Sequence, residues 1–175
     1  IRGNHEDMLL KGDVQPKRDQ VYQLHVTKRL LSKSALEYLA SWPVNRSIAF
    51  PAGGALFVHG SPSDPTNGYV YPSSDLSLYR TDAKFVFMGH SHHPFTRHHG
   101  ETPYVNVGSC GMPRDDGRYG AAGLFDQYTG AIRVLRFDIA SATASVLARS
   151  MPIHHSVTAV FERRRQTIFG EMDEH

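Results

Sequence analysis

Two histidines, His90 and His92, stand two positions apart directly after the apolar run KFVFM at residues 84–88. A buried strand that ends in Gly89 and is followed by two imidazoles places both rings at the carboxyl end of that strand, where open α/β sheets build their sites. Histidine is the commonest metal ligand in proteins, although lone surface histidines are ordinary. The spacing therefore indicates a metal site, or part of one, at this edge of the sheet.

Two further segments carry metal-ligating side chains in a similar context. His59 and Gly60 follow the apolar run at residues 55–58, and Asn4 and His5 stand where an earlier strand would end. A lone strand-end histidine is usually structural or exposed, and an Asn before acidic residues is usually a helix N-cap. Imidazole nitrogen and amide oxygen without thiolates, however, suit Mn, Fe, Zn, Ni or Co ions better than a structural Cys-rich zinc site. Together, the three segments favour a catalytic metal site.

Helical and strand patterns predict the elements that hold these residues. Apolar residues at roughly helical spacing predict helices, and short apolar runs bounded by Gly, Pro or Asn predict strands. The expected helices cover residues 6–10, 19–31, 32–42, 74–79 and 139–150, and a last basic helix ends at Arg163, Arg164 and Arg165. The expected strands cover residues 47–50 and 55–58 as one hairpin, 84–88, 103–107, and 121–126 and 131–137 as a second hairpin.

Two loops lie between these elements near the candidate site. Residues 61–72 are rich in Pro, Ser, Asn and Gly, and a loop of this length is often functional, so it is a candidate substrate lid. Its Tyr69 and Tyr71 could stack on a ligand, but we expect them to pack the loop down. In the second loop, residues 108–114, Arg114 could reach an anion, although a solvated arginine is the more frequent outcome.

Composition excludes several other classes of protein. The chain has 175 residues, of which 40% are hydrophobic and 21% charged, enough for one folded, soluble domain with its own core. A net charge of +2 argues against a specific nucleic-acid-binding surface. No apolar run reaches the roughly 20 residues that span a bilayer, and no signal-peptide pattern is present. With Cys110 as its one cysteine, we expect a cytoplasmic protein without membrane partners.

Three motifs in this order resemble those of the calcineurin-like metallophosphoesterases: GNHE at residues 3–6, VHGS at 58–61 and GHSH at 89–92. The later VNVGSCGMPR at 105–114 resembles the small bacterial phosphodiesterase branch of this family, so the likeness covers nearly the whole chain. The resemblance implies an α/β fold, a calcineurin-like two-sheet β-sandwich flanked by helices. It also implies metal-dependent hydrolysis of phosphate esters. Phosphodiesters are favoured, while a phosphoprotein phosphatase or a dinucleoside polyphosphate hydrolase would use the same core.

The resemblance also implies a role for each matching residue. Asn4, His59 and His90 would bind one divalent ion, and His92 would bind a second. His5 would face the phosphate, where it stabilises charge or protonates the leaving alkoxide. Two ions about 3.5 to 4 Å apart can hold a hydroxide for in-line attack on phosphorus and neutralise the phosphoryl oxygens.

The sequence departs from the family pattern at its start. Two further motifs of the family, Asp-x-His and Gly-Asp-x-x-Asp, supply the other metal ligands and the bridging carboxylate, and both precede the GNHE motif. We therefore expect residues 1–175 to be a metallophosphoesterase domain that is N-terminally incomplete, with the missing N-terminal segment supplying the remaining ligands. The full-length protein would be an active enzyme, and the chain alone would be nearly inactive.

Two other hypotheses are compatible with the motifs. A non-catalytic protein-binding scaffold can share this fold, but loss of the metal ligands is its hallmark, and Asn4, His59, His90 and His92 are all present. Alternatively, the histidines bind only a structural zinc ion, which predicts one tightly held ion and a large fall in melting temperature on chelation.

Overall fold

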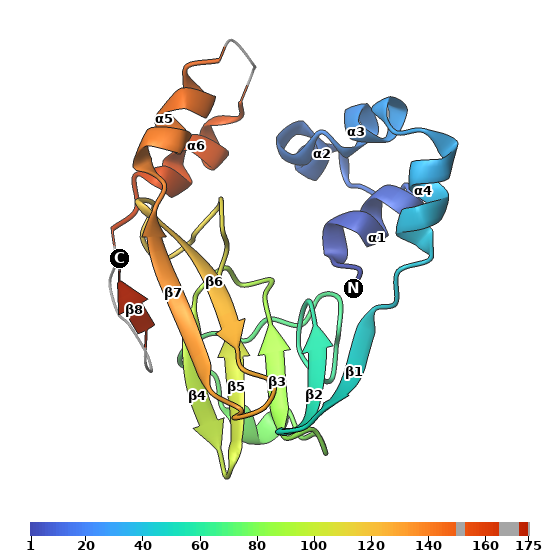
Figure 1. Cartoon of the computed structure of the whole chain (residues 1–175). Coiled ribbons are helices and arrows are strands. Elements are labelled where there is room, and N and C mark those ends of the chain that lie inside the picture. Colours follow the sequence, from blue (N-terminus) through green and yellow to red (C-terminus); the bar gives the residue numbers. More distant parts are fainter. Residues whose placement is uncertain (150–152, 165–171, 175) are drawn as a thin grey trace.

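The computed structural model describes residues 1–149, 153–164 and 172–174, which form two β-sheets and two groups of helices (Figure 1). The larger sheet has the order β1-β2-β3-β5-β4, and the smaller sheet has the order β6-β7-β8. The strands are β1 (Asn45–Phe50), β2 (Gly53–Val58), β3 (Phe85–Met88), β4 (Phe95–His99), β5 (Thr102–Asn106), β6 (Tyr119–Phe125), β7 (Ile132–Asp138) and β8 (Met172–Glu174). The expected α/β fold with flanking helices is confirmed.

Strand direction in the larger sheet brings the candidate site together. β1 and β2 form an antiparallel hairpin, whereas β2 pairs with β3, and β3 with β5, in parallel. The carboxyl ends of β2, β3 and β5 therefore lie at one edge of the sheet, where the segments that follow Val58, Met88 and Asn106 begin. All four residues of β3 are buried, as expected for a central strand that is covered on both faces.

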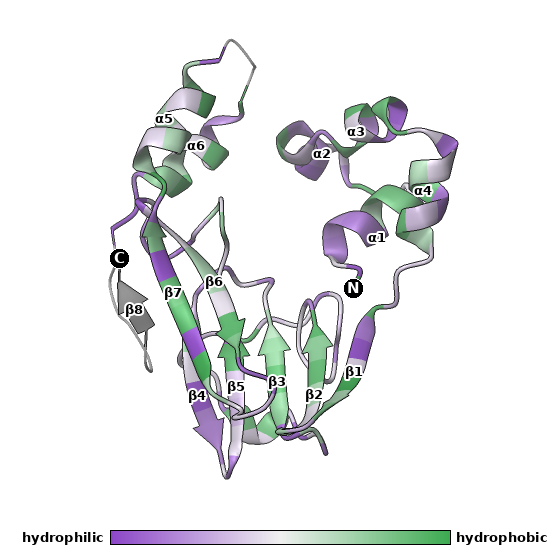
Figure 2. Ribbon diagram, viewed as in Figure 1, coloured by the Kyte–Doolittle hydropathy of each residue, from purple (hydrophilic) through white to green (hydrophobic). Residues whose placement is uncertain are grey.

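The larger sheet separates two apolar clusters. Alternate residues of β3 point to opposite faces, so Val86 and Met88 belong to one cluster and Phe85 and Phe87 to the other. The second cluster joins the two sheets, because it includes Val134 of β7. Figure 2 shows β2 and β3 as hydrophobic over most of their length and the edge strand β4 as hydrophilic. Burial of such side chains stabilises the fold by about 1.5–3 kcal/mol each.

Both groups of helices lie beyond the edge toward which β2, β3 and β5 point (Figure 1). One group comprises α1 (Asn4–Lys11), α2 (Pro16–Tyr22), α3 (Leu24–Leu30) and α4 (Lys33–Ala40), and the other comprises α5 (Ala140–Leu147) and α6 (His155–Phe161). The 3₁₀-helix η1 (Leu76–Leu78) belongs to neither group and contacts β4. In the described part of the chain, no helix is long and apolar enough to cross a membrane.

The single helix expected at residues 19–31 is wrong. The chain forms α2 and α3 instead, and they meet at Gln23, whose φ of 50° is left-handed. Asp19 explains the break, because its Oδ1 accepts hydrogen bonds from the backbone N–H groups of Leu24 (2.8 Å) and His25 (3.2 Å). The Asp19 side chain, within α2, therefore satisfies the first two backbone N–H groups of α3, a local interaction that apolar spacing does not reveal.

Other elements also differ from the sequence pattern. The pattern does not predict β4, because Phe95 is its one buried residue and the strand pairs on one side alone, with β5. Helix α2 begins early, at Pro16, which suits the first turn of a helix. Helix α6 ends at Phe161, short of the expected arginines. Arg165, and Ser150 at the end of the helix expected at 139–150, lie outside the described residues.

Candidate metal centre

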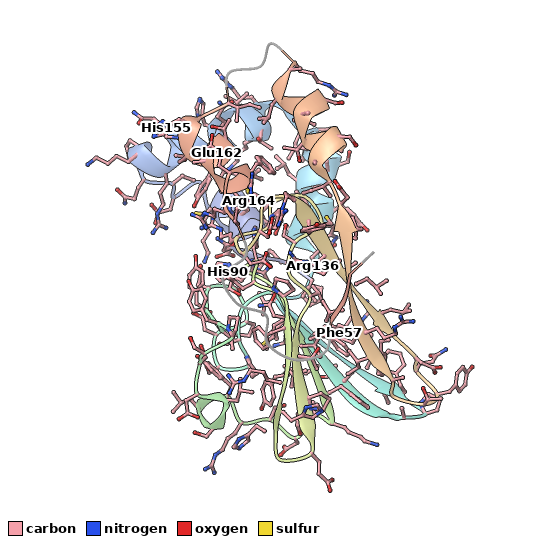
Figure 3. All side chains as sticks on the ribbon, turned by 90° about the vertical axis from the view of Figure 1, so that its left-hand side faces the viewer. Phe57, His90, Arg136, His155, Glu162 and Arg164 are labelled. Atoms are coloured by element: carbon pink, nitrogen blue, oxygen red, sulfur yellow. The ribbon has the colours of Figure 1, made fainter. Side chains whose placement is uncertain are left out.

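Three side chains from separate segments meet at the carboxyl edge of the larger sheet. His59 follows β2, His90 follows β3, and Asn4 opens α1. The Nε2 atom of His59 lies 2.9 Å from Oδ1 of Asn4 and 3.1 Å from Nδ1 of His90. Figure 3 shows His90 at the end of the sheet that lies toward the helices. We call these three residues the donor cluster.

The spacing of the donor cluster fits the ligand set of a single divalent ion. Two ligand atoms bound at about 2.1 Å and at right angles to each other lie about 3.0 Å apart, close to the 2.9 Å and 3.1 Å separations observed here. Among the described residues, no group of three or more His, Cys, Asp or Glu side chains is placed to hold an ion. The donor cluster is therefore a partial set of two imidazoles and one amide oxygen.

Burial keeps the imidazoles of the donor cluster in the neutral form that binds metal ions. Desolvation, followed by the charge of neighbouring His90, lowers the pKa of His59 from 6.5 to about 4. Desolvation also lowers the pKa of His90, and the charge of His92 adds to the effect. A neutral imidazole has a free lone pair on one nitrogen, so both rings can act as ligands at neutral pH.

The start of α1 is built to bring Asn4 to His59. Gly3 is the N-cap residue, and its backbone N–H donates a hydrogen bond to Oε2 of Glu6 at 2.8 Å. A Cβ at Gly3 would lie 2.9 Å from Nδ1 of His59, so a larger residue would displace the ring. The frequent role of Asn as an N-cap does not hold here, because Asn4 is the first helical residue and its side chain reaches His59 instead.

The turn that carries both motif histidines is strained and firmly held. His90 and His92 have left-handed φ values of 59° and 57°, which cost roughly 1–2 kcal/mol for a residue with a Cβ. Asn106, fully buried at the end of β5, donates hydrogen bonds to the carbonyl oxygen of Gly89 (2.6 Å) and to Oγ of Ser91 (2.9 Å). The motif likeness does not assign Asn106 a role, although a polar residue inside the apolar strand YVNV is a usable signal.

His92 lies beside the donor cluster, and no hydrogen bond among the described residues joins it to that cluster. Its Nδ1 is 2.7 Å from the carbonyl oxygen of Met112. In this contact Nδ1 donates, so the neutral ring keeps its lone pair on Nε2. Desolvation lowers the pKa of His92, while the Met112 carbonyl raises it. The ring could therefore ligate an ion at a second position through Nε2.

His5 is next to the donor cluster on α1. Its ring packs against Tyr22 with 4.5 Å between the ring centroids. Desolvation lowers the pKa of His5, the negative charge of Glu6 raises it, and the positive charge of Arg114 lowers it. The charge of His5 in turn lowers the pKa of His59, so the two rings lie near each other. The structure therefore places His5 beside the donors without a described hydrogen bond to them.

A positively charged side chain lies near this group of histidines. Arg114, in the loop between β5 and β6, lowers the pKa of His5, His90 and His92 through its charge. Its backbone N–H donates to the carbonyl oxygen of His92 at 3.1 Å. Within the described part of the chain, its guanidinium makes no hydrogen bond and no ion pair. An anion at this edge of the sheet would be attracted to Arg114.

An apolar cavity of about 300 Å³ opens next to the donor cluster. It reaches His59 and Gly89, and its walls come from both sheets. The apolar wall residues are Ile1, Phe57, Val58, Phe87, Met88, Val107 and Phe125. The cavity is thus large enough to receive several further apolar side chains beside the site.

A two-sheet α/β fold with imidazole and amide donors gathered at one strand edge resembles the architecture of the metallophosphoesterases. Residues 1–127 match the family model of the calcineurin-like phosphoesterase superfamily domain. The chain belongs to this superfamily, whose members hydrolyse phosphate esters with bound divalent metal ions. The family expected from the three motifs is confirmed.

Three relatives illustrate how far the likeness extends. The chain is 27% identical to the uncharacterized protein MJ0912 of Methanocaldococcus jannaschii, over 72% of this chain and 59% of that protein. It therefore spans less than two thirds of the length of this curated relative. A metallophosphoesterase from Sphaerobacter thermophilus has a TM-score of 0.74 and 20% identity, over 91% of this chain and 74% of that one. The hypothetical protein PH1004 from Pyrococcus horikoshii has a TM-score of 0.70 and 18% identity, over 93% and 70%. Both solved structures therefore share the fold of this chain.

Proposed function

We propose that the full-length protein hydrolyses phosphate esters, and phosphodiesters in particular, with two divalent metal ions. The observation that carries the proposal is the convergence of Asn4 Oδ1, His59 Nε2 and His90 Nδ1, with separations of 2.9 Å and 3.1 Å, from segments far apart in the chain. Membership of the superfamily supports the reaction class. The mixed nitrogen and oxygen donors suit Mn, Fe, Zn, Ni or Co.

This proposal gives each residue of the site a role in metal binding or catalysis. Asn4, His59 and His90 hold one ion, and His92 holds the other through Nε2. When bound, such ions supply an activated water and neutralise the charge of the phosphoryl oxygens. His5 faces the ester and donates from its ring N–H to a phosphate oxygen or to the leaving alkoxide. Because desolvation lowers the pKa of His5, the neutral ring is favoured as the donor.

The remaining ligands come, in this proposal, from an N-terminal segment of the full-length protein. Two observations support this: the donor cluster is a partial ligand set, and the chain spans only 59% to 74% of its relatives. The apolar cavity beside His59 and Gly89 provides a place where such a segment can pack. The chain alone should then bind metal weakly and be nearly inactive.

Hydrolysis of bis-p-nitrophenyl phosphate by the full-length protein with Mn tests the reaction. His90→Ala should lower turnover by at least about 100-fold, because it removes a metal ligand. The matched control is His98→Ala, which removes an exposed histidine of β4 and should keep full activity. Absence of turnover by the wild-type protein would overturn the proposal, as would full turnover by His90→Ala. A phosphopeptide and a dinucleoside polyphosphate, assayed in parallel, separate the related substrate classes.

Metal content distinguishes the enzyme from the structural alternatives. The proposal predicts two ions per full-length chain by inductively coupled plasma mass spectrometry, and loss of at least one in His92→Ala. A structural zinc site predicts a single ion, retained in His92→Ala, and a large fall in melting temperature on chelation. A protein-binding scaffold predicts no turnover at any metal content.

A further inference from the structure

Two exposed tyrosines form a continuous aromatic surface with the donor cluster. Tyr69 and Tyr71 are 51% and 42% exposed, and their rings stack at 5.6 Å with only 6° between the planes. The Tyr69 ring lies 4.0 Å from the His90 ring, measured between centroids. The Tyr71 ring lies 5.6 Å from the His93 ring, so both tyrosines pack in part against the segment that carries the GHSH turn, as expected. About half of each side chain nevertheless stays exposed, and the ring pair leads outward from a proposed metal ligand.

The residue between the two tyrosines does the packing. Val70 is almost completely buried in the apolar cluster on that face of the sheet. Its carbonyl oxygen accepts a hydrogen bond from Oγ of Ser91, in the GHSH turn, at 2.9 Å. The three residues thus alternate out, in, out, as an extended segment does. Burial of Val70 fixes both tyrosines on the side that faces solvent.

The backbone of the pair is tied down on both sides. The hydroxyl of Tyr79 donates to the carbonyl oxygen of Tyr69 at 3.3 Å, and the backbone N–H of Tyr71 donates to Oγ of Ser74 at 2.9 Å. Arg97 of β4 donates from Nη1 to the carbonyl oxygen of Ser74 at 2.7 Å. The rings are therefore positioned before any ligand binds, which lowers the entropy cost of binding.

The loop segment that precedes Tyr69, residues 60–68, is also closely packed. The backbone N–H of Gly60 donates to the carbonyl oxygen of Pro65 at 2.7 Å, and that of Gly68 donates to the carbonyl oxygen of Asp64 at 3.1 Å. A Cβ at Gly60 would lie 2.5 Å from the Asp64 carbonyl oxygen, so the strand end and the loop touch directly. The loop is thus anchored at the residue that follows His59.

We propose that Tyr69 and Tyr71 form an aromatic platform that binds the planar ring of a nucleotide-type phosphoester whose phosphate lies at the donor cluster. This rests on the proposed function and names its substrate class. Stacking of a base on an aromatic side chain contributes about 1–3 kcal/mol and tolerates any base, since every base has a π-face. The platform therefore favours substrates that carry a nucleobase, and it does not distinguish one base from another.

Two methyl phosphodiesters that differ only in the base test the platform, with the full-length protein and Mn. The methyl ester of adenosine 5′-monophosphate should have a KM about 5- to 100-fold lower than the methyl ester of ribose 5-phosphate. Tyr69→Leu and Tyr71→Leu should each bring the two KM values together. Tyr69→Phe and Tyr71→Phe keep the ring and should keep the preference. Tyr128→Leu, at a tyrosine that is 72% exposed in the β6–β7 turn, is the matched control and should keep it as well.

The outcomes separate the platform from the reaction. Equal KM values in the wild-type protein, or an unchanged preference in both Leu variants, would overturn the platform while leaving the phosphodiesterase intact. If the wild-type protein hydrolyses neither ester, the proposed function fails, and binding of adenosine 5′-monophosphate by saturation-transfer NMR then decides the platform. Binding that is lost in both Leu variants supports it. Binding retained in both, or absent from the wild-type protein, contradicts it.

Discussion

Asn106 donates a hydrogen bond of 2.6 Å to the carbonyl oxygen of Gly89, and so joins the last residue of β5 to the first residue after β3. The same Nδ2 donates to Oγ of Ser91, and Oδ1 accepts from the backbone N–H of Gly108 at 2.9 Å. One buried amide therefore satisfies polar groups of both loops that border the donor cluster. The geometry of the GHSH turn depends on a residue that lies outside that motif.

Asn106→Ala should destabilise the protein by about 2–4 kcal/mol. The substitution leaves buried polar groups of both loops without their partner, and each such loss costs about 1–3 kcal/mol. Urea denaturation measures the change. Asn45→Ala, at an exposed position where β1 begins, is the control and should stay within about 0.5 kcal/mol. A cost for Asn106→Ala no larger than that of the control would show that the loops hold their shape without it.

Glycine at position 90 should give a more stable protein than alanine, by about 1 kcal/mol. His90 has a φ of 59°, a conformation that glycine adopts without strain and alanine does not. At His98, by contrast, the alanine variant should be more stable than the glycine variant, because β4 is extended there and glycine weakens a strand. Thermal or urea unfolding of the four variants, in metal-free buffer, measures both differences. The same order at both positions would mean that the turn relaxes when the imidazole is removed.

Sequence patterns predict the sheet well where packing is local and repetitive. The apolar runs at 55–58 and 84–88 become β2 and β3, because buried parallel strands need apolar residues on both faces. The edge strand β4 escapes prediction for the converse reason, since only Phe95 is buried. The break at Gln23 escapes because it depends on hydrogen bonds that the Asp19 carboxylate accepts from the backbone of α3, and not on periodicity.

The residues of the candidate site can be named from the sequence, but their arrangement cannot. Asn4 and His59 are 55 positions apart, and their contact depends on how α1 is placed against the end of β2. Gly3 shows this dependence, because its lack of a side chain leaves space for the His59 ring. The platform of Tyr69 and Tyr71 is likewise visible only once the burial of the residue between them is known.

Acid should destabilise the metal-free protein partly through His59. The unfolded chain binds a proton at this residue below about pH 6.5, whereas the folded protein binds it only near pH 4, because desolvation lowers the pKa. Between these values the unfolded state binds more protons, so the free energy of unfolding falls as the pH falls. His59→Gln should therefore show a shallower loss of stability than the wild-type protein over this range, with EDTA present. Parallel curves for the two proteins would mean that His59 is protonated equally in both states.

Asp115→Ala should be among the most destabilising changes outside the donor cluster. Oδ2 of Asp115 lies 2.6 Å from Nη1 of Arg136 on β7, and the two side chains are only 9% and 3% exposed. Removing one partner leaves a buried charge without compensation, which costs about 3–5 kcal/mol. Urea denaturation should show this cost, with Glu101→Ala on the exposed β4–β5 turn as the control, within about 0.5 kcal/mol.

The double variant decides whether the charge is the cause. Arg136→Met combined with Asp115→Ala removes both charges and should be more stable than Asp115→Ala alone, because no unpaired guanidinium remains buried. Equal or lower stability of the double variant would assign the loss to packing around Arg136, which also lies 5.9 Å from the ring centroid of Tyr119. Asp115 directly follows Arg114, whose backbone N–H donates a hydrogen bond to the carbonyl oxygen of His92. Variants that break the Asp115–Arg136 ion pair should therefore also weaken this hydrogen bond.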